Sequence, residues 1–384
     1  MIFAIYGVNF QNKGAELMLY ATQEKIKEWD KTNSVACHLL IGNFEQRNSK
    51  DISHLMERRI SRFPKFDNLT SLFSKLIPSF IRAKNNLILE SEVDVIFNAS
   101  GFAYSDQWGP DASQQMAKRC LKWKRQNKKI ILLPQAFGPF ENPQVKEAFI
   151  TIANNVDLIF ARDDISYNYI SNLPISLANV KIAPDFTNLV KPQQTSYIKD
   201  LANRIAIVPN QRMLDKTLDL TSNQYFEFLT KAINYLHEQK KNPFILVHET
   251  KDIDLAQKLK SNIKKPIQII QEENPLILKG ILGQSDFVIG SRFHSLISAL
   301  SQNIPCIGTG WSHKYQTLFQ EYNCSELLVT FEATNMEVSL NKLNLLLNYQ
   351  SKSEIVNKIK VSSEKQKELS QLMWEKVQST VYSK

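Results

Sequence analysis

The stretch that decides the fold reads Asp286-Phe-Val-Ile-Gly-Ser-Arg-Phe-His-Ser-Leu-Ile-Ser-Ala-Leu300. It begins with a short apolar, β-prone run that ends at Gly290, and further on Leu296, Ile297 and Leu300 share one helical face. This pattern predicts a strand, a tight turn and a helix. Units of this kind build parallel sheets with right-handed crossovers.

The turn of such a unit lies at the carboxyl end of its strand, beside a helix N-terminus whose N–H groups and dipole favour an anion. Arg292 and His294 fall in this turn or in the first helical turn. The helix is expected to end near Asn303; a second buried run, Pro305–Gly308, follows, and Lys314 comes after it. We therefore predict a small-anion site built from Arg292, His294 and Lys314. Taken singly, each residue fits a structural role better: a surface charge for Arg292, a helix cap or core histidine for His294 and a solvated lysine for Lys314.

The rest of the chain repeats the alternation of apolar runs and helix-length polar stretches, which predicts an α/β protein with two doubly wound, Rossmann-like domains facing each other across a cleft. The polar stretch Val190–Ser196 is the expected linker. We expect domains at 1–190 and 197–350, and a charged helical segment at 351–384 that packs back across them. The predicted strands are Ile2–Tyr6, Val35–Ile41, Val93–Asn98, Ile130–Leu133, Asp157–Ala161, Arg204–Val208, Phe244–His248, Ile267–Ile270, Phe287–Gly290, Pro305–Gly308 and Leu327–Val329.

Composition sets the class of protein. With 384 residues, 43% of them hydrophobic, the chain can form two real cores. The first residues read as a strand and not as a signal peptide, and no apolar run approaches the ~20 residues of a membrane span, so we expect a cytoplasmic protein. The formal charge of +9 suits acidic small molecules, anionic lipid or nucleic acid, although dispersed lysines also fit a plain basic surface. The four cysteines have neither disulfide nor metal-ligand spacing, and we expect no metal.

Two strand-end loops of the first half carry polar residues. In the loop after strand Ile2–Tyr6, Asn9 or Asn12 can cap the next helix and Gly14 permits close backbone approach. The loop Asn98–Gly109 packs hydroxyl, carboxylate and aromatic groups together, which suits a sugar or equally an ordinary loop with its aromatic residues in the core. Later strand ends carry Arg162-Asp163, a pair that is often only a salt bridge, and Arg212, which could add charge to a donor pocket or lie on the surface.

These motifs together resemble the polysaccharide pyruvyltransferase family, whose members share a glycosyltransferase-B-like architecture. The resemblance covers nearly the whole chain and is strongest from Gly290 to Lys314. It departs from the family pattern where Ala99-Ser-Gly101 replaces a glycine-rich turn and where Ala136 replaces a glycine. The motifs are Asn12-Lys-Gly-Ala-Glu16, Asn98–Gly109, Leu133-Pro-Gln-Ala-Phe-Gly-Pro139, Phe160-Ala-Arg-Asp-Asp-Ile-Ser166, Ala183-Pro-Asp185 and Gly290-Ser-Arg-Phe-His-Ser295 with Lys314.

The resemblance implies transfer of a pyruvyl group from phosphoenolpyruvate to two hydroxyls of a saccharide, without a cofactor, giving a cyclic ketal. It puts the donor on the C-terminal domain and the acceptor on the N-terminal domain. His294 would orient or protonate the donor, and Asp163 or Asp185 would handle protons. The implied donor residues are Arg162, Arg292, His294 and Lys314, with Arg212 as an added charge, and the implied acceptor residues are Asn12, Ser100, Gly101, Tyr104 and Asp106.

Three alternatives stay open. A nucleotide-sugar glycosyltransferase could use the same architecture, with the basic turn holding a diphosphate. A non-enzymatic nucleic-acid or membrane-binding protein also fits the charge, but the chain has no recognisable nucleic-acid motif, so we expect no nucleic-acid partner. Finally, the basic, amphipathic segment Met56–Ile88 could contact the anionic inner face of the cell membrane, where a lipid-linked acceptor would be held. Alternatively, it could simply pack on the first sheet.

Overall fold

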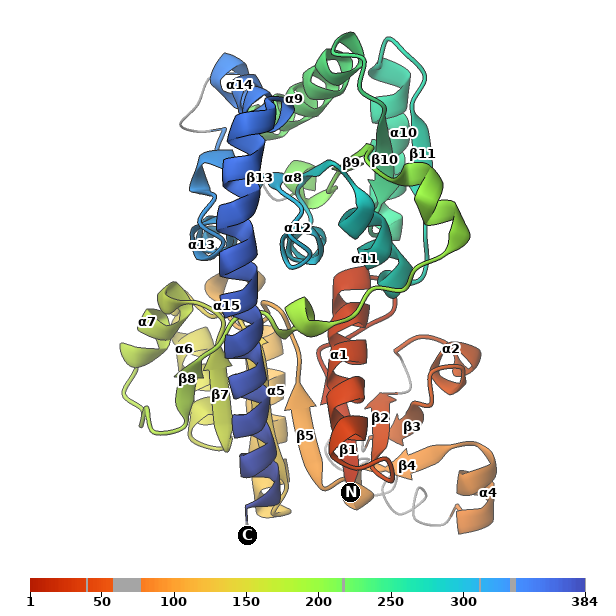
Figure 1. Cartoon of the computed structure of the whole chain (residues 1–384). Coiled ribbons are helices and arrows are strands. Elements are labelled where there is room, and N and C mark those ends of the chain that lie inside the picture. The colour runs from red at the N-terminus through yellow and green to blue at the C-terminus, as the bar shows by residue number, and fades with distance from the viewer. Residues whose placement is uncertain (39–40, 58–76, 216–217, 311, 332–335, 384) are drawn as a thin grey trace. The chain divides into compact units, whose positions relative to one another are not determined.

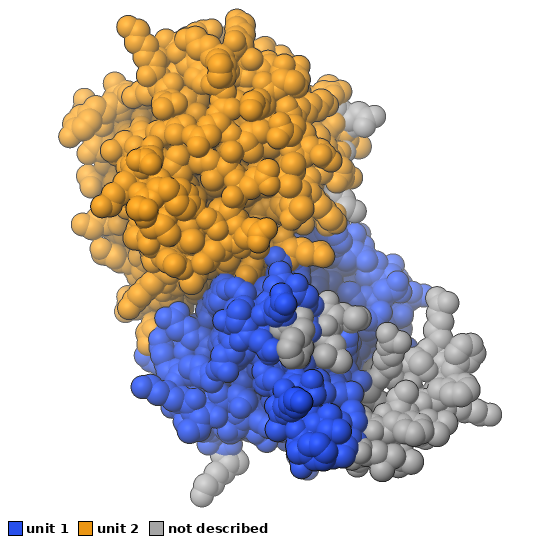
Figure 2. Space-filling model, turned by 90° about the vertical axis from the view of Figure 1, so that its right-hand side faces the viewer, with its two compact units in different colours: residues 1–10, 18–184, 372–384 blue, residues 11–17, 185–371 orange. Residues whose placement is uncertain are grey.

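The computed structural model describes residues 1–38, 41–57, 77–215, 218–310, 312–331 and 336–383. The chain divides into two compact units, neither of which is one continuous segment (Figure 2). Unit 1 comprises Met1–Phe10, Met18–Pro184 and Leu372–Lys384, and unit 2 comprises Gln11–Leu17 and Asp185–Gln371. The expected linker Val190–Ser196 thus lies inside unit 2.

Among its described residues, unit 1 has one parallel sheet of eight strands in the order β4-β3-β2-β1-β5-β6-β7-β8 (Figure 1). Its central strands β5, β6 and β7 are mainly apolar and buried, as expected for parallel strands that are covered on both faces. The strands are β1 (Ile2–Tyr6), β2 (Ser34–His38), β3 (Ser53–Met56), β4 (Leu87–Leu89), β5 (Val95–Asn98), β6 (Lys129–Gln135), β7 (Leu158–Ala161) and β8 (Val180–Ile182). The helices are α1 (Lys13–Trp29), α2 (Phe44–Asn48), α4 (Ser79–Lys84), α5 (Pro110–Arg125), α6 (Pro143–Ala153) and α7 (Asp164–Ser171).

Unit 2 has a parallel sheet of six described strands in the order β11-β10-β9-β12-β13-β14. This order reverses between β9 and β12, and ligands of doubly wound sheets bind at the carboxyl ends of the strands beside such a reversal. The strands are β9 (Ile205–Val208), β10 (Pro243–Val247), β11 (Gln268–Gln271), β12 (Phe287–Gly290), β13 (Cys306–Thr309) and β14 (Leu328–Val329). The helices are α8 (Arg212–Asp215), α9 (Asp219–Glu238), α10 (Ile253–Asn262), α11 (Pro275–Gln284), α12 (Phe293–Leu300), α13 (His313–Glu321), α14 (Met336–Leu347) and α15 (Tyr349–Tyr382).

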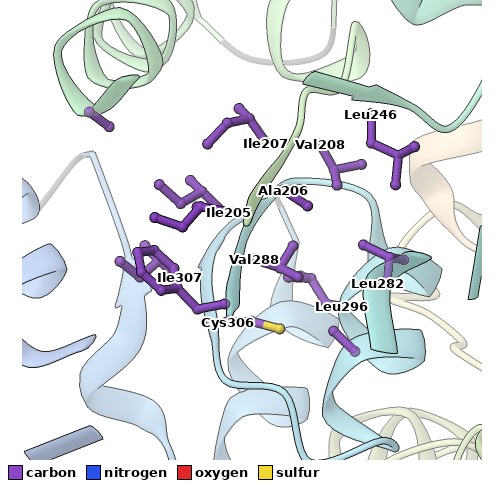
Figure 3. Close-up of a cluster of buried hydrophobic side chains, with 14 of the residues drawn as sticks. Ile205, Ala206, Ile207, Val208, Leu246, Leu282, Val288, Leu296, Cys306 and Ile307 are labelled. Atoms are coloured by element: carbon purple, nitrogen blue, oxygen red, sulfur yellow. The ribbon is translucent and has the colours of Figure 1, made fainter. Parts of the chain in front are cut away.

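The core of unit 2 forms around its three central strands (Figure 3). Ile207 of β9, Val288 of β12 and Ile307 of β13 are fully buried, and Leu282 of α11 and Leu296 of α12 pack against the same layer. Burial of each such side chain contributes about 1.5–3 kcal/mol. This packing fixes the strand ends from which the polar residues of unit 2 project.

The single long helix α15 belongs to both units. Its Ile355 and Ile359 are part of the unit 2 core. From Leu372 onward the helix is part of unit 1, where Trp374 packs edge-on against Trp29 at 5.9 Å between ring centroids. Helix α15 thus covers most of the expected charged helical segment 351–384 and contributes side chains to each unit.

The predicted strands all occur, with ends that differ by at most a few residues, so the α/β, doubly wound class is confirmed. The sequence reasoning missed β3, β4 and β8, of which β4 and β8 are the edge strands of the unit 1 sheet. They are short, and two of them contain a polar residue in mid-strand, which breaks the apolar run that marks a buried strand. The four cysteines are buried as free thiols.

Much of the basic segment Met56–Ile88 lies outside the described residues, which omit 58–76. Its described part includes the end of β3, the start of β4 and α4, a short helix in which none of the six residues is buried. Phe80 and Ile81 of α4 are exposed. In the part of the chain that the structure describes, every helix is too short or too polar to cross a lipid bilayer.

Candidate functional site

A buried hydrogen-bond network joins the carboxyl ends of β9, β12 and β13 in unit 2. Its centre is Ser291, whose hydroxyl lies 2.9 Å from the Tyr225 hydroxyl and 2.6 Å from that of Thr309. The Ser291 carbonyl accepts hydrogen bonds from the Asn210 amide at 2.7 Å and from the Tyr315 hydroxyl at 2.9 Å. Because these groups are buried and mutually satisfied, they hold the turn between β12 and α12 in one conformation.

Arg292 follows this turn as the N-cap residue of α12 and is bound by two carboxylates. Its Nε donates to Asp252 Oδ2 at 2.9 Å and its Nη2 donates to Asp252 Oδ1, while Nη1 donates to Glu249 Oε2. All three residues are buried, Asp252 completely. The bidentate face of this predicted donor residue therefore lies on Asp252, and its contact with Glu249 uses a single nitrogen.

The protonation of this cluster follows from its burial and charges. Burial lowers the pKa of Arg292, but Asp252 and Glu249 outweigh burial and the pKa of the guanidinium is raised. Burial raises the pKa of Asp252, and Arg292 offsets only part of this. Arg292 thus stays charged and ties the start of α12 to the segment after β10.

His294, in the first turn of α12, is the residue around which the predicted motifs of unit 2 meet. Its Nε2 lies 3.4 Å from Asp185 Oδ2, an ion-pair distance that is longer than a hydrogen bond. On its other side, a Cβ built on Gly14 would lie 2.2 Å from His294 Nδ1. The close approach predicted for Gly14 is confirmed, and the neighbour it approaches is this imidazole.

The loop that carries Gly14 is fixed by Asn12. The Asn12 Oδ1 accepts hydrogen bonds from the backbone N–H groups of Gly14 at 3.0 Å and Ala15 at 3.4 Å. Asn12 also forms an isolated antiparallel bridge with Glu249. The predicted cap of α1 is therefore Asn12, and its side-chain oxygen is engaged by the backbone.

Lys314 follows β13 and Arg212 follows β9, the two strands that flank β12 in the unit 2 sheet. Lys314, half-buried in the first turn of α13, lies with Nζ 5.1 Å from the ring centre of Phe293, the residue before His294. This is a cation–π distance. Arg212 opens α8 after β9 and donates its backbone N–H to Asn210 Oδ1 at 2.9 Å. Both basic residues thus follow strands at the carboxyl edge of the sheet.

His248 directly follows β10, in a buried position beside this cluster. Burial, followed by the charges of Arg292, His294 and Lys13, lowers the pKa of His248 to about 3. The ring is therefore neutral near pH 7. A pocket of about 180 Å³ opens beside it, and its lining includes Lys13 and the three carboxylates of Glu249, Glu272 and Glu273. This acidic lining disfavours an anion such as phosphate.

The remaining predicted residues lie in unit 1. Asp163 caps α7, because its Oδ1 accepts the backbone N–H of Ser166 at 2.6 Å. Arg162, buried beside it at the end of β7, donates its backbone N–H to the carbonyl of Gln135 at 3.0 Å. Both residues therefore stand at the carboxyl edge of the unit 1 sheet.

The predicted acceptor loop follows β5 at the reversal point between β1 and β5. Ser100 lies so close to Gly7 that a Cβ on Gly7 would be 2.0 Å from its hydroxyl oxygen. The Gly101 carbonyl accepts the Ala136 N–H at 3.0 Å.

Tyr104 and Asp106 of the same loop have structural contacts. Tyr104 is buried, its hydroxyl accepts from the Asn98 amide at 3.0 Å, and burial raises the pKa of the phenol. The Asp106 carboxylate accepts the backbone N–H groups of Glu141 at 2.7 Å and Asn142 at 3.2 Å. Ser100 is half-buried and forms a side-chain hydrogen bond with Tyr104. Gly101 beside it is half-buried as well.

Sequence reasoning did not assign roles to Glu249, Asp252 or Lys279. His248-Glu249 at a strand end was a visible signal, whereas Asp252 stands in a polar segment with nothing to distinguish it. Lys279 could have been noticed, because it is a single charge inside the apolar run Pro275-Leu-Ile-Leu-Lys-Gly-Ile-Leu282.

Comparison with known proteins gives both a family and a set of similar folds. The family model for polysaccharide pyruvyl transferase matches residues 12–313, which is more than half of the chain. Solved structures with the same fold include Anabaena HepE in complex with UDP-glucose, at 11% identity and a TM-score of 0.62, covering 99% of this chain and 100% of that one.

Two further similar structures come from other bacteria. A glycosyltransferase from Rickettsia africae matches at 15% identity and a TM-score of 0.61, covering 99% of this chain and 98% of that one. The UDP-GlcNAc 2-epimerase from Neisseria meningitidis matches at 10% identity and a TM-score of 0.60, covering 98% of this chain and 99% of that one. At these identities the similarity establishes a glycosyltransferase-B-like fold.

Proposed function

Because the chain belongs to the polysaccharide pyruvyl transferase family, we propose that it transfers a pyruvyl group from phosphoenolpyruvate to two hydroxyls of a saccharide. The observation that supports this most is the position of His294: it stands after β12, beside the strand-order reversal of unit 2, with Asp185 on one side and Gly14 on the other. An imidazole at an anion-favouring helix start suits a donor that is both charged and in need of a proton.

We propose that the donor's two anionic groups bind at the start of α12. The backbone N–H groups of the first helical turn and the Lys314 ammonium supply positive potential there. Arg292 adds to it through Nη1, since its contact with Glu249 uses one nitrogen whereas Asp252 holds two. Arg212 adds charge from the neighbouring strand end. Arg162 of unit 1 stays a prediction of the family resemblance.

The proposed reaction begins with proton transfer to the donor and ends with closure of the ketal ring. His294 gives a proton to the methylene carbon of phosphoenolpyruvate, and one saccharide hydroxyl forms a C–O bond to the adjacent carbon. The C–O bond to phosphate then breaks and phosphate leaves, its charge stabilised by the basic groups. The second hydroxyl forms the other C–O bond and releases its proton, which closes the cyclic ketal. Asp185 or Asp163 accepts the hydroxyl protons.

On the acceptor side, we propose that the saccharide contacts Ser100 and Gly101 of unit 1, with Tyr104 and Asp106 shaping the loop. A lipid-linked acceptor would place the enzyme, in the cytoplasm, against an anionic membrane. The exposed Phe80 and Ile81 of α4, with basic residues in its last turn, support such a contact. Flotation with anionic liposomes tests it, and a protein that stays in the bottom fraction with and without anionic lipid contradicts it.

The test of the donor is a thermal-shift titration with phosphoenolpyruvate and, in parallel, UDP-glucose. A ligand that binds the native state raises the midpoint by mass action. We expect a saturable shift with phosphoenolpyruvate that is lost in His294→Ala and kept in His237→Ala, a second unit 2 histidine located on α9. A shift with UDP-glucose alone would replace the proposal with nucleotide-sugar glycosyl transfer.

Phosphate release completes the test. Purified protein, phosphoenolpyruvate and a panel of oligosaccharides should release phosphate only when a suitable saccharide is present, and the product should gain the mass of a pyruvyl ketal. Release of phosphate at the same rate without any saccharide would contradict transfer.

A further inference from the structure

Lys279 is a lysine in the interior of unit 2. It lies in α11, among Leu278, Ile281 and Leu282, and only 1% of its surface is exposed. Its ammonium donates a hydrogen bond to the carbonyl of Thr187 at 2.7 Å. A buried ammonium is costly unless an acidic group compensates it, so the position requires an acidic neighbour.

That neighbour is Asp185. Burial lowers the pKa of Lys279 to about 7, and the charge of Asp185 is the largest influence that raises it. Lys367 of α15 acts in the opposite direction. Asp185 is itself buried, with 4% of its surface exposed. The opposite charges of Asp185 and Lys279 therefore offset part of the cost of burying each of them.

Thr187 connects them. Its backbone N–H and its hydroxyl both donate to Asp185 Oδ1, at 3.0 and 2.6 Å, while its carbonyl accepts from Lys279. Thr187 belongs to the single-turn helix η3 (Phe186–Leu189), which Asp185 caps. The turn is thus held from both ends, and Asp185 Oδ1 is fully engaged.

The other carboxylate oxygen is directed to the proposed catalytic histidine. Asp185 Oδ2 lies 3.4 Å from His294 Nε2, and α12, which carries His294, packs against both α11 and η3. The order of groups is therefore Lys279, Thr187, Asp185 and His294, running from the core to the site. All four residues belong to unit 2.

We propose that Lys279 is a positioning residue for the reaction. Through Thr187 it holds Asp185 with one carboxylate oxygen toward Nε2 of His294. This arrangement selects Nδ1 as the nitrogen that exchanges a proton with substrate. The inference rests on the proposed function of His294. A carboxylate beside one ring nitrogen keeps the proton on that nitrogen and leaves the other for chemistry. Nδ1 is the nitrogen on the Gly14 side of the ring, where the backbone approaches so closely that an added Cβ would lie 2.2 Å from it.

The experiment compares Lys279→Met with Lys279→Gln and Thr187→Val. Methionine removes the donor and the charge at similar volume, glutamine keeps a donor, and valine removes only the Thr187 hydroxyl. Lys265→Met, which removes a lysine that donates to the His237 carbonyl in the same unit, is the matched control. Urea unfolding first identifies which variants are folded, and at least one folded variant of the three is needed for the next readouts.

The first readout is the tautomer of His294 in the ligand-free protein, from long-range ¹H–¹⁵N spectra of the six histidines, with His294→Gln to assign its signals. We expect Nε2–H in the wild type and in Lys265→Met, and a mixture in Lys279→Met. An unchanged His294 spectrum in every folded variant overturns the inference. This measurement needs no donor. It therefore tests the positioning of His294 even if phosphoenolpyruvate does not bind and the proposed function is wrong.

The second readout is steady-state kinetics. We expect kcat to fall about tenfold or more in Lys279→Met with KM for phosphoenolpyruvate changed by less than about twofold, because orientation is lost and donor binding is not. Thr187→Val should lie between Lys279→Met and the wild type. A rise in KM with kcat unchanged would make Lys279 part of donor binding instead and would overturn the positioning role.

Discussion

Asp252 is completely buried and accepts hydrogen bonds from the Arg292 guanidinium through both carboxylate oxygens. This arginine of a family signature motif is therefore already bound by a side chain of the protein. Asp252 also accepts the Gln211 N–H at 2.9 Å, which connects the segments after β9, β10 and β12. The guanidinium of Arg292 therefore has a structural role in holding these segments together, and it is also a candidate binding group for the donor.

Removing this partner should destabilise the protein. In Asp252→Ala the buried Arg292 keeps its contact with Glu249 but loses the bidentate one, and breaking a buried ion pair costs about 3–5 kcal/mol. The free energy of unfolding, from urea titration at pH 7, measures the loss. Asp254→Ala, an exposed acid two residues away on α10, should stay within about 0.5 kcal/mol of the wild type. Equal effects of the two changes would mean that the pair carries no special weight.

Glu249 is expected to compete with the donor for Arg292. Glu249→Gln removes a negative charge beside Nη1 and keeps the shape, so more of the guanidinium charge becomes available to an anion. We expect KM for phosphoenolpyruvate to fall severalfold with little change in kcat. Thermal-shift titration gives an independent affinity. Weaker donor binding in this variant would show that Glu249 is needed to orient Arg292.

A side chain at position 14 should disable His294 without unfolding the protein. The Cβ of alanine would meet His294 Nδ1 at 2.2 Å and Cγ at 2.5 Å, so the ring must move. Misplacing a catalytic group by such a shift costs about 100-fold in rate. The check is a double-mutant cycle: Gly14→Ala should lower kcat in the wild type and have no further effect in His294→Ala. Additive effects would separate the two residues.

Acid should weaken unit 2 through His248. In the folded protein the pKa of His248 is lowered from 6.5 to about 3, first by burial. Between these values an unfolded chain binds a proton that the folded chain does not, so the free energy of unfolding falls as pH falls, by at most about 1.4 kcal/mol per pH unit. Urea titrations at pH 7 and pH 5 measure this slope.

His248→Phe is the matching control for that slope. It should show a smaller loss between pH 7 and pH 5 than the wild type. The slope should shrink and not vanish, because burial also lowers the pKa of His54 and His237. An unchanged slope in His248→Phe would mean that His248 titrates normally.

The extent to which the sequence predicts this structure depends on how local each signal is. Strands such as β9 and β12 are apolar runs bounded by turns, and a strand buried on both faces leaves that mark in its own residues. The edge strand β8, Val-Lys-Ile, has only one buried residue and leaves no such mark. Its place is set by pairing with β7, which is a tertiary contact.

The same distinction separates the site residues that could be predicted from those that could not. His294 and Asp185 belong to family motifs, and the structure brings them to 3.4 Å although they are far apart in the chain. The partner of Arg292 could not be named in advance, because Asp252 becomes distinctive only once the strand ends are side by side. Tyr104 shows the converse case, where a residue suited to a sugar is buried as a core phenol.

The division of helix α15 between the two units has a consequence for biosynthesis. Unit 1 includes Trp374 and its neighbours, which are translated after every residue of unit 2. The ribosome therefore has to synthesise all of unit 2 before unit 1 can be completed. Neither unit can then be isolated by cutting the gene once. A protease that nicks α15 near Gln371 would leave unit 1 without its final packing element, even with every other residue in place.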